Sequence, residues 1–195
     1  TLVKYYAKDA CQNIDSCTYE IIVQDQSAPT IVMDQKYYVF LEADGTAKLP
    51  ISKIDQGTYD NCGVVSALEV RRVANAKKAA STWADALIFD CDDLEIPTQL
   101  ELRAVDNSGN EGTRVVDVIV LDNLAPTITC PVDITVNCNA LPIGIEVGGL
   151  PTVKDNCSAT ADFTDKVLLN GCGAGTIERT WIAKDKSSRN SEPLH

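Results

Sequence analysis

The chain has 195 residues and a formal net charge of −11 at pH 7, with a sequence pI of about 4.4. This acidity argues against nucleic-acid binding, because the phosphates of nucleic acids require a basic face. The length suits one large domain or two domains of about 100 residues each. Hydrophobic residues make up 45% of the chain, which indicates a globular protein, and the sequence shows neither a signal peptide nor a membrane-inserted segment.

Segments with an alternating or β-branched apolar pattern predict β-strands along most of the chain. In chain order, the clearest segments are 1–9, 46–54, 64–72, 99–105, 113–121 and 176–184. Residues 74–87 have a helix-forming composition, but Ser81, Thr82 and Trp83 interrupt it. We expect a loop or irregular crossing there, with a short helix as the alternative. About seven strands in each stretch of roughly 95 residues predict an all-β chain of tandem immunoglobulin-like (Ig-like) β-sandwich repeats.

One phrase occurs twice and divides the chain into units. QDQSAPTIVM begins at Gln24 and LDNLAPTITC at Leu121, which places the two Ala-Pro-Thr-Ile segments 97 residues apart. Self-similarity of this kind indicates a repeat protein. We therefore predict the end of a first repeat at 1–26, a complete repeat at 27–123 and a third, incomplete repeat at 124–195. We expect the chain to be part of a longer protein that supplies the missing strands; strands donated by identical chains in a filament are the alternative.

The repeated motifs also resemble a known family. APTITCPVDITV (125–136), followed by DNC and by a late A-x-D-x-[SG]-x-N loop, resembles the HYR (hyalin repeat) type of Ig-like domain. EVRRV, TWADALIFDCDDL and LELRAVDNSGNEGT in the middle repeat resemble HYR-like repeats of very large secreted bacterial surface proteins. The middle repeat departs from the pattern, with Val32-Met33 where the third has Thr129-Cys130. The resemblance implies adhesion or an extracellular stalk, with neighbouring repeats as partners, and no catalysis.

The cysteines point to disulfides and an extracellular or cell-surface location. The chain has eight cysteines, no C-x-x-C motif and one histidine, His195, so zinc has no ligand pattern. Cysteines that are present or absent together in the different repeats predict four bonds, namely Cys11–Cys17, Cys62–Cys91, Cys130–Cys138 and Cys157–Cys172. Buried free thiols are the alternative. A straight strand between residues 130 and 138 would span roughly 26 Å, so that pair requires the chain to fold back.

Aspartates predict a cation site at the junctions between repeats. The chain has 19 Asp against 9 Glu, and Asp is favoured both in turns and as a ligand of Ca²⁺. In an Ig-like sandwich the B–C and F–G loops lie at one end, beside the start of the first strand. The candidate Ca²⁺ ligands in these segments are Asp25, Asp55, Asp60, Asn61, Asp106, Asp122, Asp155 and Asp185. The alternative is that these residues only form turns.

These patterns favour a structural and adhesive extracellular module, a segment of a disulfide-stapled, Ca²⁺-stiffened stalk or filament. The alternative is a module that binds glycans or proteins through its loops, with Trp83, Trp181, Tyr37, Tyr38 and Tyr59 as candidate contacts. We do not expect an enzyme, because catalytic triads and Cys–His dyads need a histidine and the chain has one, at its last position.

Overall fold

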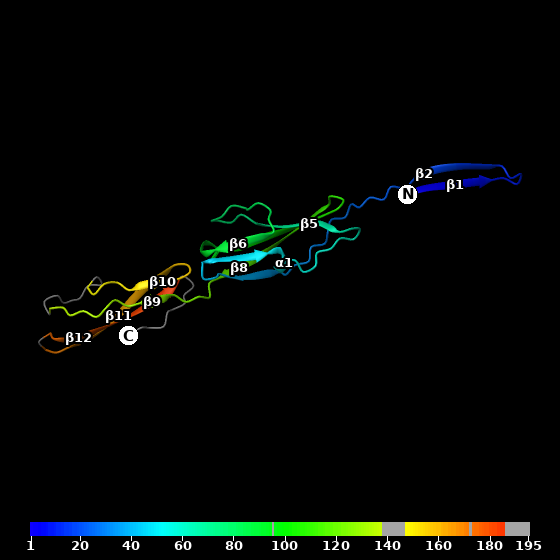
Figure 1. The fold of residues 1–195 in the computed structure, drawn as a ribbon. Helices are drawn as coiled ribbons and strands as arrows, with labels where there is room; N and C mark the ends of the chain where they lie inside the picture. The colour runs from blue at the N-terminus through cyan, green and yellow to red at the C-terminus, as the bar shows by residue number, and fades with distance from the viewer. Residues whose placement is uncertain (95, 138–146, 172, 186–195) are drawn as a thin grey trace.

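The computed structural model describes residues 1–94, 96–137, 147–171 and 173–185, and it is all-β. Three parts follow one another along a line (Figure 1): a hairpin (residues 1–20), a middle unit (27–123) and a third unit (from residue 124). The hairpin consists of β1 (Leu2–Lys8) and β2 (Ile14–Glu20). Within the described ranges, no helix is long and apolar enough to cross a membrane.

The middle unit contains two sheets. Its strands and short helices are β3 (Lys36–Phe40), β4 (Thr46–Pro50), α1 (Ile51–Ile54), β5 (Val65–Arg72), β6 (Ala86–Asp90), η1 (Cys91–Asp93), β7 (Thr98–Asp106) and β8 (Glu111–Leu121). The larger sheet has the order β3-β8-β7-β5, with β3 parallel to β8 and the other pairs antiparallel; β4 and β6 form the smaller sheet. Alternation along β7 and β8 turns every second side chain into the core, as the sequence pattern predicted.

One hydrophobic core joins the two sheets. Its most enclosed side chains include Ile54, Val70, Phe89, Leu100 and Leu102, which come from α1, β5, β6 and β7. The prediction of a continuous strand at 46–54 is wrong in its second half, because the chain turns through α1 and thereby buries Ile54. Residues 74–85 form the predicted irregular crossing, without a helix, but the last two residues of the predicted segment, Ala86 and Leu87, begin β6.

A buried ion pair fixes the end of the middle unit that faces the third unit. Arg72, the last residue of β5, donates to both carboxylate oxygens of Asp93 in η1, at 2.7 and 3.0 Å. Lys78 bonds the same carboxylate and that of Asp90. The side chain of Asp93 is only 1% exposed, so these partners compensate a carboxylate that has lost its water.

The turn of the hairpin matches the β7–β8 turn bond for bond. Asn13 donates to Asp9 through its backbone (2.8 Å) and its side chain (2.7 Å), and Asn110 donates to Asp106 in the same way, at 2.9 and 2.8 Å. Asp9 and Asp106 are 97 residues apart in the sequence, as are the Ala-Pro-Thr-Ile phrases. The hairpin therefore has the local structure of the β7–β8 pair.

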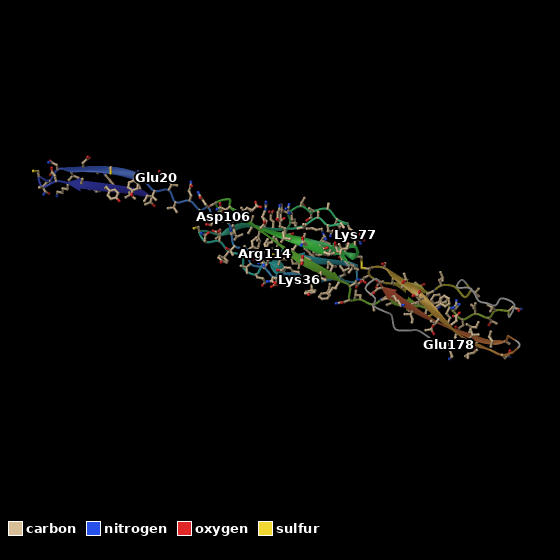
Figure 2. All side chains as sticks on the ribbon, turned by 180° about the vertical axis from the view of Figure 1, so that it is seen from behind. Glu20, Lys36, Lys77, Asp106, Arg114 and Glu178 are labelled. Carbon is tan, nitrogen blue, oxygen red and sulfur yellow. A yellow bond between two sulfur atoms is a disulfide. The ribbon has the colours of Figure 1, made fainter. Side chains whose placement is uncertain are left out.

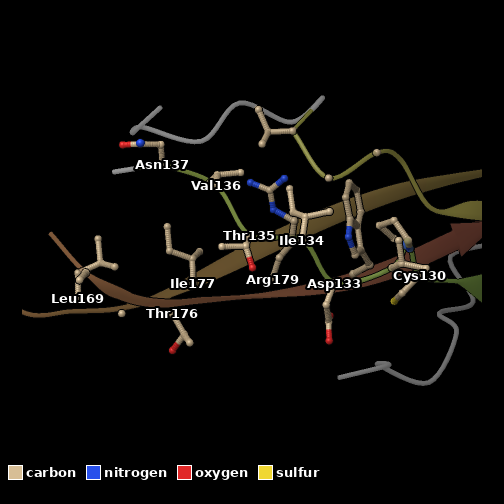
Figure 3. Close-up of a pocket in the computed structure, with 18 of the residues that line it drawn as sticks. Cys130, Asp133, Ile134, Thr135, Val136, Asn137, Leu169, Thr176, Ile177 and Arg179 are labelled. Atoms are coloured by element: carbon tan, nitrogen blue, oxygen red, sulfur yellow. The ribbon is translucent and has the colours of Figure 1, made fainter. Parts of the chain in front are cut away.

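The third unit carries two antiparallel pairs of strands and a groove. β9 (Thr127–Thr129) pairs with β10 (Thr152–Lys154), and β11 (Ala159–Leu169) pairs with β12 (Gly175–Asp185). Figure 3 shows Ile134 and Val136, from the segment after β9, together with Ile177 and Arg179 of β12 among the residues that line the groove. The groove has a volume of about 790 Å³. The two sides of the groove correspond to β7 and β3 of the middle unit. β12 ends in Ala-Lys-Asp as β7 ends in Ala-Val-Asp, and residues 130–137 lie 97 positions after residues 33–40, which include β3. In the middle unit β8 lies between β3 and β7, so we interpret the groove as interior space between strands.

Candidate cation site at the junctions

Three carboxylates meet where the linker from the hairpin reaches the middle unit. Asp25 belongs to the linker, Asp60 to the loop before β5, and Asp106 to the end of β7. One carboxylate oxygen of each lies within 4.8 Å of the other two. Figure 2 labels Asp106 at the end of the middle unit nearest the hairpin. The structure thus brings together one residue from each of the three segments in which the sequence predicted ligands.

Asp106 is held rigidly and in its charged form. Its Oδ1 accepts hydrogen bonds from the backbone amides of Ser108 (2.7 Å) and Asn110 (2.9 Å), and its Oδ2 accepts one from the Asn110 side chain (2.8 Å). Burial alone would raise the pKa of Asp106, but these hydrogen bonds outweigh it and the pKa is lowered. Asn110 also donates to the carbonyl oxygen of Asp25 at 3.2 Å, which ties the linker to this loop.

Asp60 leaves one oxygen without a donor. Its Oδ2 accepts from the amide of Cys62 at 2.9 Å, whereas its Oδ1 is buried and accepts no hydrogen bond within the described part of the chain. A buried carboxylate oxygen in that state is costly, and Asp25 and Asp106 bring two more acidic groups beside it. A cation would compensate all three. Ca²⁺ takes six to eight oxygen ligands at 2.3–2.6 Å from flexible sites, so three carboxylates at this spacing supply part of such a shell.

Two other predicted ligands lie outside this cluster. The Oδ1 of Asp55 accepts from the amides of Gly57 (3.3 Å) and Thr58 (2.8 Å), so Asp55 shapes its own turn. Asn61 is exposed and its amide contacts the sulfur of Cys62 at 3.4 Å. The turn-forming alternative therefore describes Asp55 in this structure.

The junction between the middle and third units is organised differently. Asp122 and Asp185 are buried there, and Asp155 is half-buried. Asp122 accepts from the amide of Leu124 (3.0 Å) and from the Asn156 side chain (3.1 Å). Within the described ranges, Asp122, Asp155 and Asp185 do not form a cluster with oxygens as close as those of the first junction. The Asn156 side chain supplies one donor to Asp122, whereas the Oδ1 of Asp155 is buried and accepts no hydrogen bond within the described residues, like the Oδ1 of Asp60.

A disulfide crosses this second junction. Cys91 in η1 is bonded to Cys157 of the third unit, with their Cα atoms 5.6 Å apart and a sequence separation of 66. Beside it, Asn156 donates to the carbonyl oxygen of Glu42 at 3.2 Å. Gly45 (φ +76°) lies so close that a Cβ there would stand 2.5 Å from the carbonyl oxygen of Asn156. The two units are thus joined by a covalent bond and a close backbone contact.

This bond corrects two predicted pairings. Cys62–Cys91 is wrong because β5 separates the two residues: Cys62 lies just before β5 begins, and η1 lies where β5 ends. Eight residues of strand span roughly 26 Å, far more than a disulfide bridges. Cys157–Cys172 is wrong because Cys157 is bonded to Cys91. Cys172 itself lies outside the described residues.

The other predicted pairings do not form bonds that the structure describes. Cys11 and Cys17 are free and exposed. Cys17 lies opposite Tyr5, three residues along β2 from Ile14, the last paired residue before the turn. That is roughly 10 Å of strand, and Cys11 lies in the turn beyond it, so the prediction of a Cys11–Cys17 bond is wrong. Cys130 carries a free thiol, and Cys138 lies outside the described residues.

The aromatic candidates for ligand binding fall into three groups. Trp181 and Tyr37 are buried, at 3% and 7% exposure, and serve the cores of their units. The ring of Trp83 contacts the guanidinium groups of Arg71 and Arg103, whose central carbons lie 4.4 and 4.8 Å from the ring centroid. Tyr38 and Tyr59 are exposed. No cluster of exposed aromatic side chains emerges from these five residues.

Two asparagines organise the junctions, and the sequence analysis missed Asn110 as a functional residue. Asn110 links the carboxylate of Asp106 to the linker, and Asn156 links the third unit to the middle unit. A signal for Asn110 was present, because the same Asp-to-Asn spacing of four occurs in the hairpin. No family model matches the chain, and a search of curated proteins gives no match. Function is therefore inferred from the geometry of the junctions.

Proposed function

We propose that this chain is a structural segment of a long extracellular protein, made of Ig-like units of the HYR type joined in tandem. The observation that carries the proposal is the convergence of Asp25, Asp60 and Asp106, from a linker and two separate loops, at the junction before the middle unit. A cation shared by a linker and the loops of the next unit would fix the angle between two units. This is what a stiff stalk or filament shaft requires.

The disulfide and the arrangement of the units support the same function. The bond between Cys91 and Cys157 fits an oxidising, extracellular setting. Units that contact only their neighbours along a line suit a spacer (Figure 1). Its partners would then be neighbouring units of the same protein and, in a filament, identical chains.

A calcium titration of the full chain tests the proposal. Extracellular calcium modules bind with dissociation constants of about 10⁻⁴ to 10⁻³ M, so 1 mM Ca²⁺ should stabilise the middle unit by about 0.4 to 1.4 kcal/mol. For a unit of this size, that corresponds to a rise in Tm of roughly 2 to 10 °C over the value in EDTA. Asp60→Asn and Asp106→Asn should each abolish the rise.

Asp44→Asn is the matched control. Asp44 caps a turn at the opposite end of the middle unit, where it accepts from the amide and hydroxyl of Thr46, both at 2.9 Å. This variant loses turn hydrogen bonds of the same kind without touching the acidic cluster, so its calcium response should equal that of the parent chain. If the Tm of the parent chain is the same in EDTA and in 10 mM Ca²⁺, the proposed cation site is wrong and the three aspartates only form turns.

A further inference from the structure

The tripeptide Asp-Asn-Cys occurs at the same place in two successive units. Asp60-Asn61-Cys62 follows the bridge between Thr30 and Tyr59, and Asp155-Asn156-Cys157 follows the pairing of β9 with β10. Each aspartate accepts a hydrogen bond from the amide of its cysteine, at 2.9 Å in the middle unit and 3.3 Å in the third. The same turn therefore presents a thiol at the end of each unit that faces the preceding part of the chain.

The two thiols differ in what they have bonded. Cys157 is bonded to Cys91 of the unit before it, and its neighbour Asn156 holds that unit through Glu42. Cys62 is exposed and free, and Asn61 contacts only the sulfur beside it among the contacts that the structure describes. Cys62 therefore has no disulfide partner in the described part of the chain, whereas the cysteine of the same motif at the second junction is bonded to Cys91.

The part of the chain before Cys62 shows what kind of unit would supply that partner. The hairpin repeats the β7–β8 turn, with Asp9 and Asn13 in the places of Asp106 and Asn110. In the middle unit, the residues that precede β7 include η1, whose first residue is Cys91. A unit that contains this hairpin and an η1-like turn would place a cysteine at the first junction as Cys91 is placed at the second.

We propose that Cys62 is one half of a disulfide between units, and that its partner is a cysteine at the position of Cys91 in a preceding unit of the same kind. The inference rests on the proposed tandem arrangement and adds a covalent bond to the first junction. The bond forms by thiol–disulfide exchange with a small disulfide such as oxidised glutathione. The Cys62 thiolate attacks it and releases one glutathione thiolate, and the partner thiolate then displaces the second. Two protein thiols are oxidised to one disulfide, and one oxidised glutathione is reduced to two thiols.

The test extends the full chain at its N-terminus by a second copy of residues 27–97. Because the repeat is 97 residues long, this copy continues directly into Thr1 and forms a complete unit with residues 1–26. After equilibration in a glutathione redox buffer, disulfide-linked peptides are identified by mass spectrometry, and alkylation of Cys62 is compared with that in the parent chain. We expect a peptide that links Cys62 to the added Cys91, and a fall in Cys62 alkylation of at least about tenfold, since adjacent units hold the thiols at millimolar effective concentration.

Two further chains keep the outcome decisive. The first carries Cys91→Ser in the added copy only, and Cys62 alkylation should return to the parent level. The second replaces residues 1–26 by 98–123, so that the added unit has the native β7–β8 pair and a core identical to that of the middle unit. Cys62 that stays fully reactive in this chain, while Cys91–Cys157 forms, would overturn the inference. The calcium response of the same chain separates this failure from that of the proposed function: if calcium still raises the Tm, the cation-stiffened junction stands without the bond.

Discussion

Removing the disulfide at the second junction by Cys91→Ser should destabilise the middle unit. The bond closes a loop of 66 residues that contains β7 and β8, half of the larger sheet. In the chain-entropy description, opening a loop of this length frees the unfolded state by about 4 kcal/mol at 25 °C. With a urea dependence of about 2 kcal/mol/M, the unfolding midpoint should fall by about 2 M.

The chain offers one fluorescent reporter for each unit. Trp83 lies in the middle unit and Trp181 in the third, and these are the two tryptophans of the chain. Urea unfolding of Cys91→Ser in Trp83→Phe and Trp181→Phe backgrounds therefore follows each unit separately. Cys62→Ser is the control, since it removes an exposed free thiol. A midpoint of the Trp83 signal that moves by less than about 0.3 M would refute the reasoning that the loop constrains this unit.

Three further predictions concern the end of the middle unit that holds the disulfide. Asp93→Ala strands the buried guanidinium of Arg72 and should cost about 3–5 kcal/mol of unfolding free energy, measured by urea denaturation; an Arg72→Met/Asp93→Leu double variant should recover most of the loss. Gly45→Ala should speed reduction of the disulfide by dithiothreitol, because a Cβ at this position would collide with the third unit. Gly57→Ala is the control: Gly57 also has a positive φ (+102°) but has open space around it, so this variant adds the backbone strain without the collision. Burial opposes the charged form of Asp90, but hydrogen bonds from its lysine and backbone partners lower its pKa below 3.8, so its contribution is present above that pH and is lost as pH falls further; acid unfolding of Asp90→Asn should show a shallower loss of stability below pH 3.8.

Local patterns in the sequence identified β1, β5, β7, β8 and β12, but they missed other strands such as β3 and β6 and did not show what joins the units. The alternation in β7 and β8 identified both strands, since a two-residue period has one structural meaning. The segment 46–54 continues an apolar pattern through Pro50, and nothing local showed that burying Ile54 would require a helical turn. A disulfide between two units depends on which ends of the units meet. This follows from the order of the strands in the sheets and not from any local pattern in the sequence.

The acidic cluster and the disulfide illustrate the same difference. Asp25, Asp60 and Asp106 were placed together because loops at one end of a sandwich are known to converge. Cys91 was assigned to Cys62 because the two cysteines of the middle repeat have counterparts together in the third, Cys157 and Cys172. In the structure β5 separates Cys62 from Cys91, which excludes that pair. Cys91 is bonded instead to Cys157, which lies in the Asp-Asn-Cys turn of the third unit.

The disulfide between Cys91 and Cys157 also sets how far the chain can lengthen under tension. A pull on the two ends passes through the sulfur–sulfur bond, so the 66 residues that it bypasses stay slack even if both units unfold. At about 3.4 Å per extended residue, this slack amounts to roughly 220 Å of contour length. A single reduction event would release it, so the oxidation state of one bond decides whether the unfolded chain acts as a short tether or a long one.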